Sequence, residues 1–139
     1  MKKTHKYYGI LDYMPRWGYT IIVLAAILWL TLGKIPRIDS DIPIWEHADK
    51  IVHAFMFGVL FLAATFDHSR IRPLEIPSIK SPYMPTVFAW TALAGAVIEL
   101  LQPYFYRSCD AADFFADVAG ILLAWLMIPL LFRRCKNSR

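Results

Sequence analysis

The chain has 139 residues, of which 58% are hydrophobic and 19% are charged, with a mean hydropathy of +0.43. A soluble domain is about half apolar and about a quarter charged, so this composition argues against a soluble globule. The formal net charge is +4, but the basic residues sit at the chain ends and in one loop, which argues against a nucleic-acid-binding face. Cys109 and Cys135 have no metal-ligand spacing and are too few for a disulfide framework.

Four predominantly apolar blocks follow one another along the chain. Each is near the short end of the roughly 17 to 25 residues that cross a bilayer as a helix. They leave too little polar sequence to coat a soluble globule. The sequence therefore predicts an all-α, polytopic membrane protein whose single domain, residues 17–132, is a bundle of four transmembrane helices. The expected helices cover about 17–35, 49–66, 84–102 and 113–132.

The segments around these blocks favour one orientation. Residues 1–16 are basic and aromatic, as expected at a membrane interface, and no cleavage site follows the first apolar block, which argues against a signal peptide. The N-terminal segment, the proline-rich second loop (67–85) and the basic tail 133–139 together hold eleven Lys and Arg. The first and third loops, with their helix ends, hold four. The positive-inside rule then places both termini in the cytoplasm.

With this topology, ionisable residues converge at the outward-facing ends of the second, third and fourth helices. Asp49 and His53 share one helix face at i,i+4 spacing, as do Asp113 and Asp117. Ionisable residues inside a membrane are costly and usually mark a functional site. The polar set is Asp49, Lys50, His53, Glu99, Gln102, Arg107, Asp110, Asp113 and Asp117.

These residue types predict an outward-facing polar pocket that binds an anionic group. Lys50 and Arg107 are expected to bind a phosphate or carboxylate, because cationic side chains form strong hydrogen bonds with such groups. If the site is catalytic, His53 is the expected general acid or base, tuned by Glu99 or Asp117. The other predicted ligand-binding residues are Asp49, Gln102, Asp110 and Asp113.

Two other classes of protein remain open. The charged network can instead be structural, holding short helices together in a non-catalytic binding or scaffold protein. Asp49, Asp110 and Asp113 can each also be explained as residues that stabilise a helix N-terminus. A small transporter or proton relay is the third class, although four helices are few for it unless the chain oligomerises. The sequence does not decide the oligomeric state or whether the protein is an enzyme.

The same residues resemble the VanZ-like family of small membrane proteins. Asp49-Lys50 with His53 resembles the family's D-K-x-x-H opening. Glu99 and Gln102, then Arg107 and an Asp-initiated last helix with Gly120, resemble its second block. The resemblance covers roughly residues 45–125. It implies a bacterial cytoplasmic membrane protein acting at the outer face, with a link to resistance against the glycopeptide teicoplanin. With this resemblance, the polar pocket is expected to recognise a cell-envelope lipid, a lipid-linked cell-wall precursor or the glycopeptide itself.

One departure from the family pattern matters for the chemistry. Asp117 stands where the family usually has Asn, and Ala124 stands where a second Gly is common. The additional carboxylate favours a bound cation or a shared proton, because like charges raise one another's pKa. The sequence thus suggests a divalent cation held by Glu99, Asp113 and Asp117, since hard cations take several carboxylate oxygens.

Overall fold

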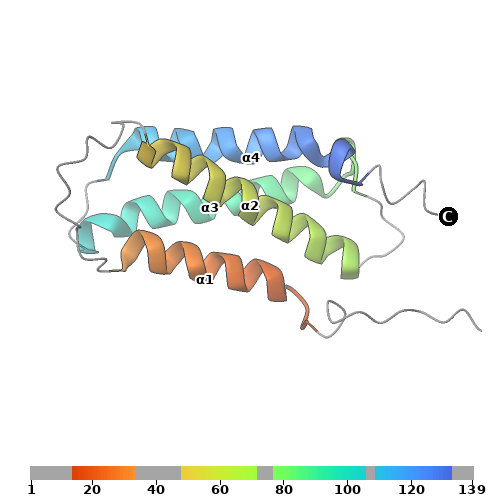
Figure 1. Cartoon of the computed structure of the whole chain (residues 1–139), viewed down its shortest axis with the longest axis horizontal. Coiled ribbons are helices and arrows are strands. Elements are labelled where there is room, and N and C mark those ends of the chain that lie inside the picture. The colour runs from red at the N-terminus through yellow and green to blue at the C-terminus, as the bar shows by residue number, and fades with distance from the viewer. Residues whose placement is uncertain (1–13, 34–47, 72–76, 106–108, 133–139) are drawn as a thin grey trace, which may run out of the picture.

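The computed structural model describes residues 14–33, 48–71, 77–105 and 109–132. These ranges contain four α-helices and no strand: α1 (Gly18–Leu32), α2 (Ala48–Ile71), α3 (Met84–Leu101) and α4 (Ala111–Phe132). A short 3-10 helix, η2 (Gln102–Phe105), continues α3. The four helices lie along a common direction, and each runs opposite to the one before it in sequence (Figure 1). The predicted all-α class is confirmed.

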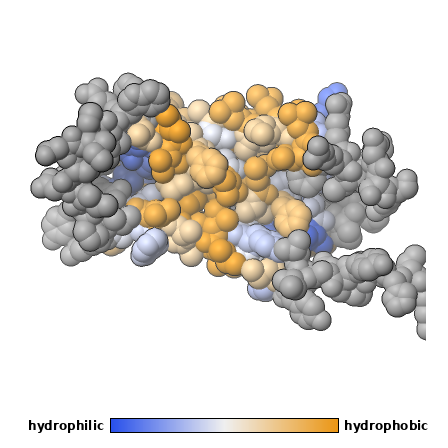
Figure 2. All heavy atoms as spheres, viewed as in Figure 1, coloured by the Kyte–Doolittle hydropathy of each residue, from blue (hydrophilic) through white to orange (hydrophobic). Residues whose placement is uncertain are grey.

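Three of the helices are long and apolar enough to cross a membrane, namely α2, α3 with η2, and α4. A band of hydrophobic side chains covers the middle of the visible face, and hydrophilic ones lie toward both ends (Figure 2). The remaining predicted span, which is the first in the sequence, is shorter than expected. Helix α1 has 15 residues and is therefore about 22 Å long, whereas the hydrocarbon core is about 30 Å thick. That α1 crosses the bilayer, and that both termini are cytoplasmic, stay predictions.

Helix α2 is longer than the sequence predicts, since it continues past residue 66 to Ile71. The buried carboxylate of Asp67 explains the extension, because it accepts hydrogen bonds from the Thr20 backbone N–H at 2.9 Å and the Thr20 hydroxyl at 2.8 Å. Arg70 completes the cluster with a 3.3 Å ion pair to Asp67 and a hydrogen bond to the Met14 carbonyl. These contacts attach the start of α1 to the end of α2.

Helix α4 also begins earlier than predicted, at Ala111 instead of 113. Asp110 caps it: its Oδ1 accepts the Ala112 N–H at 2.9 Å, and its backbone carbonyl accepts the Asp113 N–H at 2.9 Å. A side-chain oxygen that satisfies one of the unpaired N–H groups at a helix start stabilises that end. The interpretation of Asp110 as a helix-start residue therefore holds in the structure.

Helices α2 and α4 make the most extensive helix pair in the described part of the chain. Their closest approach is at Gly120, where an added Cβ would overlap the backbone carbonyl of Ala54. On the facing side, a Cβ at Gly58 would lie 3.1 Å from the Gly120 carbonyl oxygen and 3.7 Å from the Ala124 Cβ. Small residues at a helix crossing allow this kind of backbone contact in membranes. Gly120 is thus the position that sets the spacing of the two helices.

We expect Gly120→Ala to destabilise the bundle. Overpacking a buried site typically costs about 1–3 kcal/mol, and here the obstacle is a backbone carbonyl, which cannot rotate away. Unfolding in mixed micelles, followed by circular dichroism, measures the loss. Ala119→Val on the exposed face of the same helix is the matched control and should change stability little. Equal stability of both variants would contradict the close approach of α2 and α4.

Candidate polar site at one end of the bundle

The predicted polar residues meet at one end of the bundle, formed by the start of α2, the end of α3 and the start of α4. Asp49, Lys50 and His53 come from α2, and Glu99 and Gln102 from α3 and η2. Asp110, Asp113 and Asp117 come from the cap and first turns of α4. We call these eight residues the polar site. Arg107, the remaining predicted member, lies outside the described residues.

The floor of the polar site is a buried pair between His53 and Asp117. His53 Nδ1 lies 3.0 Å from Asp117 Oδ1, and the two residues are 3% and 1% exposed. An ionised carboxylate only accepts hydrogen bonds, so Nδ1 is the donor. Gly95 provides room for the carboxylate, since a Cβ there would lie 2.9 Å from Asp117 Oδ2. The pair fixes the orientation of the imidazole and leaves Nε2 as its free nitrogen.

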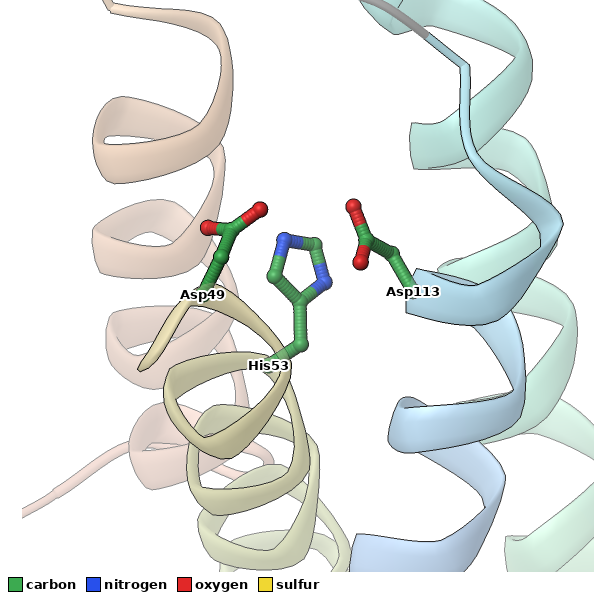
Figure 3. A group of neighbouring side chains, drawn as sticks. All are labelled: Asp49, His53 and Asp113. Carbon is green, nitrogen blue, oxygen red and sulfur yellow. The ribbon is translucent and has the colours of Figure 1, made fainter. Parts of the chain in front are cut away.

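Beyond this pair, the His53 ring lies between Asp49 and Asp113 (Figure 3). One ligand atom from each of Asp49, His53 and Asp113 lies within 4.8 Å of the other two. In Figure 3 the ring nitrogen that Asp117 does not hold faces Asp49. We call these three residues the ligand triad. In the part of the chain that is described, they are the set spaced to share a metal ion.

The ligand triad differs from the set predicted from the sequence, which was Glu99, Asp113 and Asp117. Only Asp113 belongs to both sets. The difference arises because the Asp117 carboxylate is used by His53 and a Glu99 oxygen is used by the α4 cap, where Glu99 Oε2 accepts the Asp110 N–H at 3.2 Å. The i,i+4 spacing of Asp49 and His53 was the signal in the sequence that could have identified the triad.

Lys50 lies at the rim of the site, between two carboxylates. Its Nζ is 3.2 Å from Asp110 Oδ2 and 3.4 Å from Asp113 Oδ1. The Ala112 N–H and, next, the Lys50 ammonium lower the pKa of the Asp110 carboxyl. The Lys50 charge is therefore compensated within the protein. This differs from its expected role as a phosphate ligand, for which a cation without its own carboxylate partners is better suited.

Glu99 is buried beside the cap of α4, at 4% exposed. Gln102, at 2% exposed, is buried at the start of η2, which contacts α1 and α3. Glu99 Oε1 is buried and has no hydrogen-bond partner in the described structure. A buried acceptor without a donor costs about 1–3 kcal/mol. Glu99 Oε1 can therefore accept a hydrogen bond from a ligand, or carry a proton.

Comparison with known proteins places the chain in a family. No curated protein and no solved structure matches it significantly. The family model described as VanZ/LLP1 matches residues 9–133, which include all four helices and the whole polar site. Because that match covers nearly the entire chain, this protein is a member of the VanZ/LLP1 family.

Proposed function

We propose that the polar site holds a divalent cation and, through it, the anionic headgroup of a cell-envelope lipid or lipid-linked precursor at the outer face of a bacterial cytoplasmic membrane. The observation that carries the proposal is the His53 ring, fixed at Nδ1 by buried Asp117 and placed between Asp49 and Asp113. Histidines that bind metals usually donate their other ring N–H to a carboxylate or carbonyl, which sets the tautomer and presents the lone pair to the ion.

The charge of the polar site also supports a cation. The site contains the carboxylates of Asp49, Glu99, Asp110, Asp113 and Asp117, whereas Lys50 is its one permanently charged cation among the described residues. An anionic headgroup placed against this excess of negative charge would be repelled. A divalent ion removes that repulsion and offers open coordination positions to a phosphate, as Mg²⁺ and related ions do in phosphate-binding sites.

The donor set narrows the choice of metal. One imidazole nitrogen with carboxylate oxygens suits Zn²⁺, and carboxylates also suit Mn²⁺. Ligand atoms of one ion at about 2.0–2.2 Å lie at most about 4.4 Å apart. The three triad atoms lie within 4.8 Å of one another, so at most a small movement brings them into one coordination shell. Asp49 is exposed, and rotation of its side chain supplies that movement at little cost.

The buried pair of His53 and Asp117 also favours a second function. A carboxylate that holds a histidine at Nδ1 leaves Nε2 as a general base, as in acid–base catalysis by carboxylate–histidine pairs. His53 and Asp117 have that geometry at 3.0 Å. In this alternative the protein is an enzyme acting on the headgroup, and turnover depends on His53 without needing an added ion. The two functions are distinguished by whether activity of the protein requires the cation.

We expect Zn²⁺ or Mn²⁺ to raise the melting temperature of the purified protein in detergent. An ion at about 100 times its Kd stabilises a folded protein by about 2.7 kcal/mol. Asp49→Asn and Asp113→Asn should each remove most of that gain. Asp110→Asn is the matched control, because Asp110 contacts Lys50 but lies outside the triad. The cation proposal fails if neither ion stabilises the unaltered protein, or if the control loses as much as the triad variants.

Replacements of Asp117 test whether it acts by orienting His53. The amide oxygen of Asp117→Asn can still accept the Nδ1 hydrogen bond, so ion binding should weaken only modestly. Asp117→Leu removes the acceptor and should weaken ion binding about 10- to 100-fold, as loss of a ligand's outer partner typically does. Titration calorimetry with Zn²⁺ measures both. If Asp117→Leu and Asp117→Asn bind Zn²⁺ with equal affinity, Asp117 does not position the imidazole.

The outward orientation is tested by the native cysteines. A membrane-impermeant maleimide added to intact cells should label Cys109 and not Cys135, and lysis should expose Cys135. Labelling is best done at mildly alkaline pH, because partial desolvation and the nearby charge of Glu99 raise the pKa of the Cys109 thiol. Labelling of Cys135 alone on intact cells would reverse the topology and place the polar site in the cytoplasm.

A further inference from the structure

An apolar groove lies between α1, α2 and α3, toward the end of the bundle opposite the polar site. Its volume is about 550 Å³. It exists because α1 packs on α2 and contacts α3 much less. Its lining runs from the aromatic residues Trp17 and Tyr83, at the starts of α1 and α3, to Leu24, Leu60 and Ala94 near the middle of the helices.

Two threonine hydroxyls along the groove are already hydrogen-bonded within the protein. The Thr20 hydroxyl donates to Asp67 at 2.8 Å, and the Thr91 hydroxyl donates to the Val87 carbonyl of its own helix at 2.9 Å. These threonines therefore offer little hydrogen bonding to an occupant. Cavities with apolar walls stay dry, so the groove requires an apolar occupant instead of water.

The length of the groove matches one leaflet of a bilayer. Tyr83 and Ala94 are eleven residues apart on α3, which is about 16 Å along a helix, and half of the hydrocarbon core is about 15 Å. Tryptophan and tyrosine at one end are typical of headgroup depth. A transmembrane helix from a second copy would need a contact surface that spans the whole hydrocarbon thickness. An acyl chain lies in one leaflet and needs a contact surface of only half that thickness.

The charge at the mouth of the groove indicates which lipid fits. Arg16, Arg70 and Lys80 lie at this end of the bundle. The acidic residue described there is Asp67, which is fully buried and paired with Arg70. Basic residues beside a membrane attract anionic lipids, at about 1 kcal/mol for each Lys or Arg near the surface. The mouth is therefore complementary to an anionic headgroup.

We propose that this groove binds one acyl chain of an anionic phospholipid, with the phosphate near Arg16 and the chain end near Leu24 and Ala94. The site is separate from the polar site and does not depend on the proposed cation. It lies at the other end of α2 and belongs to the opposite leaflet. If both termini are cytoplasmic, the lipid comes from the inner leaflet.

The test uses phosphatidylglycerol carrying a diazirine near the end of one acyl chain, in vesicles of phosphatidylethanolamine and phosphatidylglycerol that contain the full protein. After irradiation, mass spectrometry locates the attached lipid. We expect attachment to concentrate on Leu24, Trp90 and Ala94, and to exceed attachment to the exposed α4 residues Leu126 and Leu130. Equal labelling of all exposed apolar residues would mean that the lipid contacts the protein surface without occupying the groove, and would overturn the proposal.

Two comparisons sharpen the result. Ala94→Phe fills the groove and should lower labelling of Leu24 about tenfold, which corresponds to about 1.4 kcal/mol of binding free energy. Ala119→Phe, on the exposed face of α4, should leave it unchanged. The same diazirine lipid with a phosphatidylethanolamine headgroup should label less; equal labelling would overturn the anionic preference. A groove that stays unlabelled in the unaltered, folded protein is covered by a protein segment, which also overturns the proposal.

Discussion

The contact between Gly120 and the backbone of Ala54 sets the spacing of α2 and α4. His53 lies one residue before Ala54, and Asp117 lies one helical turn before Gly120. Their 3.0 Å pair therefore forms only if the two backbones come this close. Gly95 on α3 supplies the third part of the arrangement, since the Asp117 carboxylate rests against it. Two glycines on two helices thus create the space for one buried pair, and the remaining polar residues are arranged around that pair.

The buried pair explains why the site is polar and still stable at the end of a membrane bundle. Taking charged groups out of water costs several kcal/mol each, and the cost is recovered only when partners and hydrogen bonds are well placed. Here the burial is graded: Asp49 is exposed, Asp113 is 5% exposed and Asp117 is 1% exposed. The deepest carboxylate, Asp117, has the imidazole as partner, and Lys50 pairs with Asp113 and with Asp110 at the rim. Asp49 remains where water reaches it, and Glu99 is the exception, because its buried Oε1 has no hydrogen-bond partner in the described structure.

The sequence predicted the four helices because each apolar block forms one helix, and three of these helices have the length and composition that crossing a membrane requires. It also predicted which end of the bundle is polar, because antiparallel helices bring the start of α2, the end of α3 and the start of α4 to the same level. It could not predict which side chains pair across helices. Spacing of i,i+4 places Asp113 and Asp117 on one face, but the crossing of α2 and α4 decides that one meets Lys50 and the other His53.

The burial of Asp67 was missed for a related reason. A carboxylate after an apolar run looks like the first residue of a loop, and only the position of α1 shows that the Thr20 N–H and hydroxyl satisfy it inside the bundle. This contact has a further consequence. It fixes the start of α1 on α2, at the end where α1 and α3 stand apart and the groove opens. Helix α2 therefore contacts a neighbouring helix through a buried carboxylate toward each of its ends: His53 of α2 pairs with Asp117 of α4 at one end, and Asp67 of α2 binds Thr20 of α1 at the other. Each carboxylate positions a neighbouring helix beside a site, polar in one case and apolar in the other, so the two sites are consequences of how α2 is anchored.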